Sequence, residues 1–148
     1  MADAPRILIV TSRYYAHITA ELEAGVVEGL DKVGATHEFL EVPGAFEIPG
    51  AIAMAAQTGE WDGFVALGCV IRGETSHYDL ICEQVAHGLM ELSISGVPLG
   101  FGVLTVENEE QAKVRADRKQ KDKGAEVVAA VLRMVGLSYR FNKGAENE

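Results

Sequence analysis

Short apolar runs alternate along the chain with longer segments in which apolar residues recur every three or four positions. Runs of strand length that are apolar on both faces are typical of strands inside a covered parallel sheet. The runs predict strands at Ile7–Val10, Glu38–Val42, Phe64–Ile71 and Leu99–Val106. The recurring pattern, with the Gly and Pro residues that end several of its segments, predicts helices at His17–Val33, Ile48–Thr58, Asp79–Ser95, Glu107–Ala116 and Ala125–Tyr139.

Strands that alternate with helices predict an α/β fold, a three-layer α/β/α sandwich around a four-stranded parallel sheet. Because crossovers between parallel strands are right-handed, we expect the flavodoxin-like strand order 2-1-3-4. In such a sheet the ligand crevice lies at the carboxyl ends of the first and third strands, where the winding reverses. We therefore expect the loops Thr11–Ala16, Val42–Pro49 and Arg72–Asp79 to converge on one site.

The length of 148 residues predicts a single domain over 1–148, with flexible ends at 1–5 and 142–148. No apolar run is long enough for a signal peptide core or a membrane span, so we expect a cytoplasmic protein. Cys69 and Cys82 are the only cysteines, and their spacing fits no zinc motif. We therefore expect neither a disulfide framework nor a metal site.

The charge is acidic overall but unevenly distributed. The formal net charge is −9, which argues against a general nucleic-acid binder. Six of the 13 Lys and Arg residues lie between Lys113 and Lys123, and that segment carries +4 while the rest of the chain carries −13. A bunched basic segment favours either a small-anion site or an ordinary solvated helix face, and the second is the more common.

Each of the three converging loops carries unusual chemistry. Tyr14 suits stacking on a planar heterocycle, and equally a cap on the core or a subunit contact. Phe46 and Glu47 stand in a rigid Pro–Pro frame, where they suit contacts with a ligand ring and with hydroxyl groups. The turn Arg72–Asp79 places Thr75 and His77 at a helix start, an arrangement that suits an anion and proton exchange, although a histidine there is more often a cap.

Two familiar doubly wound classes fit the loops poorly. A response-regulator receiver domain needs acidic residues after the first and third strands, where this chain has Thr11-Ser12-Arg13 and Arg72. A flavodoxin needs a Gly-containing phosphate loop after the first strand, and here that loop is aromatic and lacks glycine. The phosphate-type turn instead follows the third strand.

Two long motifs closely resemble the 6,7-dimethyl-8-ribityllumazine synthase family. They are Pro43–Pro49 (PGAFEIP) and Leu67–Asp79 (LGCVIRGETSHYD), and the similarity runs in register from about Arg6 to Phe141. The resemblance implies a transferase of the penultimate step of riboflavin biosynthesis. This reaction condenses 5-amino-6-(D-ribitylamino)uracil with 3,4-dihydroxy-2-butanone 4-phosphate to give 6,7-dimethyl-8-ribityllumazine, phosphate and water, with no metal or organic cofactor. The alternatives are a flavin- or lumazine-binding protein without synthase activity, dismutation of two lumazines to riboflavin, and a purely structural assembly.

The resemblance also implies site residues. His77 matches the proton-transfer histidine. Contacts to the diamine are implied for Tyr14, Ala45, Phe46, Glu47, Cys69, Val70, Ile71 and Phe101. Contacts to the phosphate are implied for Glu74, Thr75, Arg115 and Lys123.

The resemblance implies a homo-oligomer, either a ring of five subunits or a multiple of such rings. Its active site is shared between neighbours, and Phe101 and Arg115 come from the neighbouring subunit. About five residues precede the first predicted strand, so we expect rings or ring pairs rather than shells. Glu74 departs from the alanine of many members, and its carboxylate would repel a phosphate unless it points away or pairs with Arg72.

Overall fold

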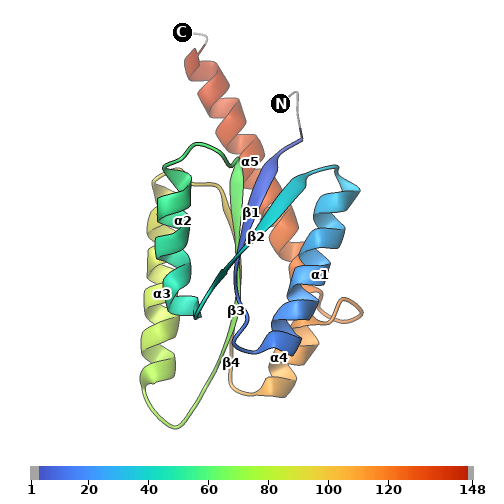
Figure 1. The fold of residues 1–148 in the computed structure, drawn as a ribbon, viewed down its shortest axis with the longest axis vertical. Coiled ribbons are helices and arrows are strands. Elements are labelled where there is room, and N and C mark those ends of the chain that lie inside the picture. The colour runs from blue at the N-terminus through green and yellow to red at the C-terminus, as the bar shows by residue number, and fades with distance from the viewer. Residues whose placement is uncertain (1–3, 147–148) are drawn as a thin grey trace.

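The structure, a computed structural model, describes residues 4–146, with side chains as far as 142. Its elements follow one another as β1 (Arg6–Ser12), α1 (Ala16–Lys32), β2 (Thr36–Val42), the 3₁₀ helix η1 (Ala45–Glu47), α2 (Ile48–Ala56), β3 (Gly63–Ile71), α3 (His77–Ile94), β4 (Leu99–Val106), α4 (Glu109–Ala116) and α5 (Lys123–Glu146). They form three layers, with α2 and α3 on one face of the sheet and α1, α4 and α5 on the other (Figure 1).

The sheet confirms the predicted class and topology. Its four strands are parallel and stand in the order β2-β1-β3-β4. The carboxyl ends of the strands and the loops that follow them gather at one end of the molecule, opposite the chain termini (Figure 1). This is the edge at which a doubly wound sheet binds its ligands.

Each face of the sheet has its own core, because successive side chains of a strand point to opposite faces. On the α1–α4–α5 face, Ile7 and Ile9 pack with Leu22 and Val131. On the α2–α3 face, Leu8 and Val10 pack with residues such as Ile52. Strand β1 is buried on both sides, as its unbroken apolar run predicted.

β2 differs from the picture of a strand covered on both faces. Five of its seven residues are exposed and none is fully buried, because it is an edge strand with only β1 as a neighbour. Its Phe39 lies under the Arg13 guanidinium, 5.7 Å from the ring centre, and beside the ring of His37. The mixed sequence of this strand reflects its exposed position.

Several helices begin or end at residues other than those predicted from the sequence. α3 begins at His77 rather than Asp79, which places the candidate histidine inside the first turn, and α4 begins at Glu109 because Asn108 caps it by accepting the Gln111 N–H at 2.9 Å. Of the ends expected to be flexible, 1–3 and 147–148 lie outside the described residues. Residues 142–146 continue α5, and the Pro5 carbonyl accepts a hydrogen bond from the Thr36 N–H.

Candidate active site at the carboxyl edge of the sheet

The three loops do leave the sheet at the same edge, but at different heights. Ser12 and Val42, the last residues of β1 and β2, are register partners. β3 pairs with β1 as far as Leu67 and then continues beside β4 to Ile71. The third loop therefore begins roughly 10 Å beyond the first two.

The two tyrosines of the first loop have different surroundings. Tyr14 is 76% exposed, and its ring meets that of Tyr15 edge-on with centroids 5.0 Å apart. Tyr15 packs against the core, and burial raises the pKa of its hydroxyl. Tyr15 thus caps the core, whereas the ring of Tyr14 is accessible to a ligand.

The second loop turns on a short 3₁₀ helix that separates its side chains. Ala45 is buried, and its Cβ lies 3.8 Å from the place that a Cβ on Gly68 would occupy, so the loop is seated against β3. Phe46 projects outward and is 55% exposed. Glu47 is also exposed, and its Oε1 faces the Gly44 backbone. The arrangement leaves one aromatic ring and one carboxylate of this loop exposed.

The end of β3 becomes more exposed toward its last residues. Cys69 is buried, and Val70 and Ile71 are half-buried. Burial, and secondarily the nearby Glu109 carboxylate, raises the pKa of the Cys69 thiol to about 11. The thiol is therefore neutral at physiological pH and is not an activated nucleophile.

The third loop contains the histidine and a threonine in direct contact. The Thr75 hydroxyl accepts a hydrogen bond from the His77 N–H at 3.3 Å, while the Ser76 side chain makes no capping bond. Thr75, His77 and Glu74 are all exposed. A solvent-facing turn of this kind, at the amino end of a helix, suits an anion.

Arg72 fixes the base of this turn. Its guanidinium pairs with Glu107 at 2.6 Å and with Asp79 at 3.3 Å, and it lies 4.4 Å from the centre of the Tyr78 ring. Arg72 therefore joins the end of β3 to α3 and to the turn before α4. It does not pair with Glu74, so the carboxylate at position 74 is not neutralised by that route.

A second group of predicted residues lies in a hollow of about 290 Å³ along the open edge of β4. Phe101, Arg115 and Lys123 all line it, and so does Lys121, to which the sequence assigned no specific role. The hollow reaches the third loop at one point, because the carbonyl of its lining residue Val106 accepts the Arg72 N–H at 2.9 Å. The predicted site residues of one chain thus fall into two groups, one on the loops and one along β4.

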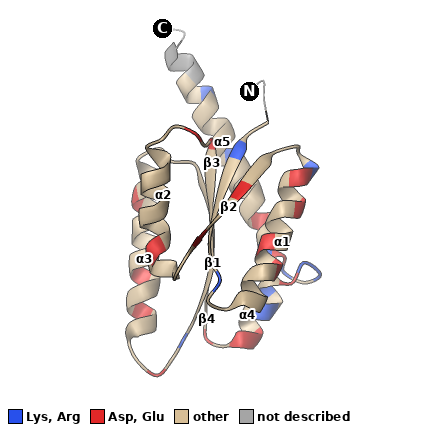
Figure 2. Ribbon diagram, in the orientation of Figure 1, with Lys and Arg blue, Asp and Glu red and all other residues tan. Residues whose placement is uncertain are grey.

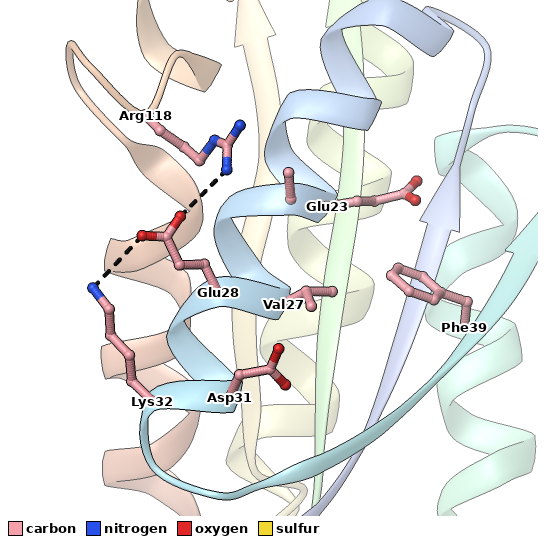
Figure 3. A pocket seen from close by; sticks show the side chains of 8 residues that line it. Glu23, Val27, Glu28, Asp31, Lys32, Phe39 and Arg118 are labelled. Carbon is pink, nitrogen blue, oxygen red and sulfur yellow. Dashed lines mark hydrogen bonds and ion pairs between the residues drawn. The ribbon is translucent and has the colours of Figure 1, made fainter.

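Another cation of the basic segment, Arg118, is paired with carboxylates of α1. Arg118 pairs with Glu21 at 2.9 Å and with Glu28 at 3.3 Å, and Glu28 also meets Lys32 (Figure 3). Arg118, Glu28 and Lys32 border a broad hollow of about 760 Å³ between α1 and β2, whose lining includes none of the predicted site residues. Figure 2 shows the cations of the segment concentrated on α4 and on the loop that follows it.

One contact at this edge has a partner that the sequence pattern did not identify. His17, in the first turn of α1, forms an ion pair with Glu109, in the first turn of α4. The pair ties together the starts of two helices that lie far apart in sequence. Only the position of α4 in the fold reveals this partner of His17.

The described residues include no group of three or more His, Cys, Asp or Glu side chains placed to hold a metal ion. Within the same part of the chain, no helix is long and apolar enough to cross a membrane.

Comparison with known proteins gives one consistent result. A sequence-family model described as 6,7-dimethyl-8-ribityllumazine synthase matches residues 4–138. Proteins of that name from Sphingopyxis alaskensis and Erythrobacter litoralis are 49% and 50% identical over 138 and 136 residues, covering 93% and 92% of this chain and 98% and 97% of theirs. The protein named 6,7-dimethyl-8-ribityllumazine synthase 1 from Rhizobium meliloti is 49% identical over 146 residues, covering 95% of this chain and 94% of its own.

Proposed function

The chain belongs to the 6,7-dimethyl-8-ribityllumazine synthase family, and from that premise we propose that it catalyses the reaction of that name. The enzyme joins 5-amino-6-(D-ribitylamino)uracil to 3,4-dihydroxy-2-butanone 4-phosphate and releases the lumazine, phosphate and water. The observation that carries the proposal is the match over almost the whole chain at about half identity. The same match does not favour a binding protein that has lost the chemistry.

The proposed reaction depends on holding its two substrates in place more than on specialised catalytic groups. Imine formation, phosphate elimination and ring closure are proton-transfer steps between two substrates that must be held together. His77 exchanges protons beside the departing phosphate. Its place in the first turn of α3, next to Thr75, supports this role because the turn that binds the anion also carries the base.

The remaining roles follow the two parts of the site. The residues that contact the diamine lie on the first two loops and at the end of β3. They are Tyr14, Ala45, Phe46, Glu47, Cys69, Val70 and Ile71. Glu74 and Thr75 stand in the phosphate turn, where Glu74 acts through its backbone. Phe101 contacts the diamine, and Arg115 and Lys123 bind the phosphate from the β4 edge.

A shared active site accounts for this division. Phe101 and Arg115 lie at the open β4 edge and complete the loops of a neighbouring subunit in a pentamer or a multiple of pentamers. Support comes from large apolar side chains that α2, α3 and β4 leave exposed, namely Met54, Leu80, Met90, Ile94 and Phe101. Isolated subunits rarely expose so many, because such a surface gains free energy when a partner covers it. We place the enzyme in the cytoplasm.

The test is to mix the purified protein with both substrates while following lumazine absorbance and phosphate release. We expect both products to form together, faster than in a protein-free control. Product at the uncatalysed rate would defeat the proposal, and tight flavin binding without turnover would favour the binding protein. Riboflavin formed from lumazine alone would identify the dismutation instead.

A further inference from the structure

The hollow at the β4 edge contains more positive charge than its neighbours neutralise. Its charged lining residues are Arg115, Lys121, Lys123 and Glu126. Glu126 pairs with Lys123, since its Oε1 lies 3.1 Å from the Lys123 Nζ. Arg115 and Lys121 are then left without a carboxylate partner in the part of the chain that the structure describes.

These two cations differ from nearby cations that do have carboxylate partners. Arg118 and Arg72 each have two carboxylates within 3.3 Å, whereas Arg115 donates from Nη1 to the Gln111 carbonyl at 3.1 Å. That bond orients the guanidinium but leaves its charge uncompensated. Lys121 has no ion pair among the described residues.

The loop that carries Lys121 is fixed by its own hydrogen bonds. The Lys121 N–H donates to the Val114 carbonyl at 3.2 Å, one residue before Arg115 on α4. Asp117 accepts the Lys119 N–H and the Gln120 side-chain N–H, both at 2.9 Å. The backbone that carries Lys121 is thus tied directly to the helix that carries Arg115.

We propose that Lys121 is a second phosphate-contacting residue, acting beside Arg115 in the hollow at the β4 edge. The inference rests on the proposed function for the identity of the substrate, but not for the chemistry of the ligand, which is a phosphate group. An ammonium point charge beside a guanidinium fork suits the three terminal oxygens of a phosphate monoester or of inorganic phosphate. Lys121 therefore sets how tightly the enzyme holds the phosphorylated substrate and how readily it releases phosphate.

The experiment compares Lys121→Gln with Lys119→Gln in the full-length protein. The two variants remove one charge each from the same loop, but the Lys119 side chain lines a different hollow, beside Asp117 and Glu21. We expect Lys121→Gln to raise the dissociation constant for inorganic phosphate, measured by calorimetry at physiological salt, roughly three- to tenfold. Lys119→Gln should change it by less than about twofold, because the Lys119 charge lies in a different hollow beside two carboxylates and is screened by solvent.

Kinetics distinguishes the phosphorylated substrate from the free ion. With Lys121→Gln we expect the KM for the butanone phosphate to rise by a similar factor while the KM for the diamine is unchanged, and Lys121→Arg should restore it. A rise in the phosphate dissociation constant without a rise in this KM would assign Lys121 to product phosphate alone. Circular dichroism and light scattering check that each variant folds and assembles.

Equal behaviour of Lys121→Gln and Lys119→Gln, or no phosphate binding by the unmodified protein, would overturn the proposal. Failure of the proposed function is distinguishable. In that case the unmodified protein makes no lumazine, yet the phosphate titration still separates the two lysine variants. Conversely, normal turnover with indistinguishable lysine variants removes only the role of Lys121.

Discussion

Single residues at the carboxyl edge show how burial selects the chemistry a group can perform. Cys69 and His77 are only eight positions apart, yet Cys69 is buried in the sheet and His77 faces solvent. Burial holds the thiol neutral, with a pKa of about 11. The exposed imidazole of His77 can exchange protons with a substrate, so of the two it is the one suited to acid–base work.

The raised Cys69 pKa predicts a loss of stability in alkali. Because the folded pKa, about 11, lies above the ordinary value of 9.0, an unfolded chain releases its proton first as the pH rises. The stabilisation is complete below pH 9 and is lost between about pH 9 and 11, on the order of 2 kcal/mol. Chemical denaturation across that range should show a steeper decline for the unmodified protein than for Cys69→Ala. Parallel declines would contradict the prediction.

Arg115→Ala should separate the two substrates. Since its guanidinium is assigned to the phosphate, we expect the KM for the butanone phosphate to rise by about tenfold or more, with little change for the diamine. Steady-state kinetics with each substrate varied in turn measures the difference. Equal increases for both substrates would remove Arg115 from the phosphate site.

His77→Ala should slow turnover without abolishing it. Proton transfer by a positioned side chain contributes about 10²-fold or more, but holding two substrates together supplies much of the remaining rate. We therefore expect a reduced kcat that still exceeds the protein-free rate, measured with both substrates saturating. Complete loss of activity in a correctly assembled variant would mean that acid–base catalysis contributes more to the rate than positioning does.

At the scale of elements, close packing of α5 on α1 fixes where the basic loop lies. Gly25 of α1 and Gly124 of α5 meet backbone to backbone, and a Cβ on Gly124 would lie 3.0 Å from the Gly25 backbone. The loop 117–122 joins α4 to α5 immediately before this crossing. The contact between two glycines therefore helps to position the loop that carries Lys121.

Gly124→Ala should destabilise the fold by about 1–3 kcal/mol, because the added methyl group meets rigid backbone rather than a movable side chain. Gly136→Ala is the matched control on the same helix, since a Cβ there would meet nothing within 4 Å. Replacing an exposed helical glycine should instead stabilise by about 0.5–1 kcal/mol. Thermal unfolding of both variants measures the contrast, and shifts of the same sign would disprove the close contact.

At the scale of the whole molecule, one set of exposed apolar side chains belongs to α2, α3 and β4. α2, α3 and β4 carry Met54, Met90, Ile94 and Phe101 outward, and the Ile94 side chain is 78% exposed. The hollow with Arg115 lies along the same β4 edge. Contact between subunits through these elements would bury apolar surface and bring the second part of the site to a neighbour.

Ile94→Arg should therefore weaken the assembly, because a charge placed in an apolar contact must be desolvated. We expect light scattering to show smaller species at micromolar concentration, and activity to fall roughly tenfold or more with them. Val33→Arg is the control, since Val33 is also exposed but stands at the end of α1, in the other layer. An unchanged Ile94→Arg assembly would place the interface elsewhere.

The sequence by itself determined the layers, the strand order and the loops that meet at the carboxyl edge. These follow from local periodicity and from the handedness of crossovers, which require no knowledge of distant contacts. It also pointed to Thr75 and His77, because a turn between a strand and a helix has recognisable chemistry. The resemblance to a known family then added Arg115 and Lys123.

Only the tertiary structure decided which groups are neighbours across long stretches of chain. In the folded chain Arg118 pairs with Glu21, Arg72 with Glu107 and His17 with Glu109. The fold also places Lys121 in the hollow with Arg115. A local pattern shows that a residue is charged, but not which opposite charges the fold brings to it. The distinction between a free cation and a neutralised one arises when helices distant in sequence pack together.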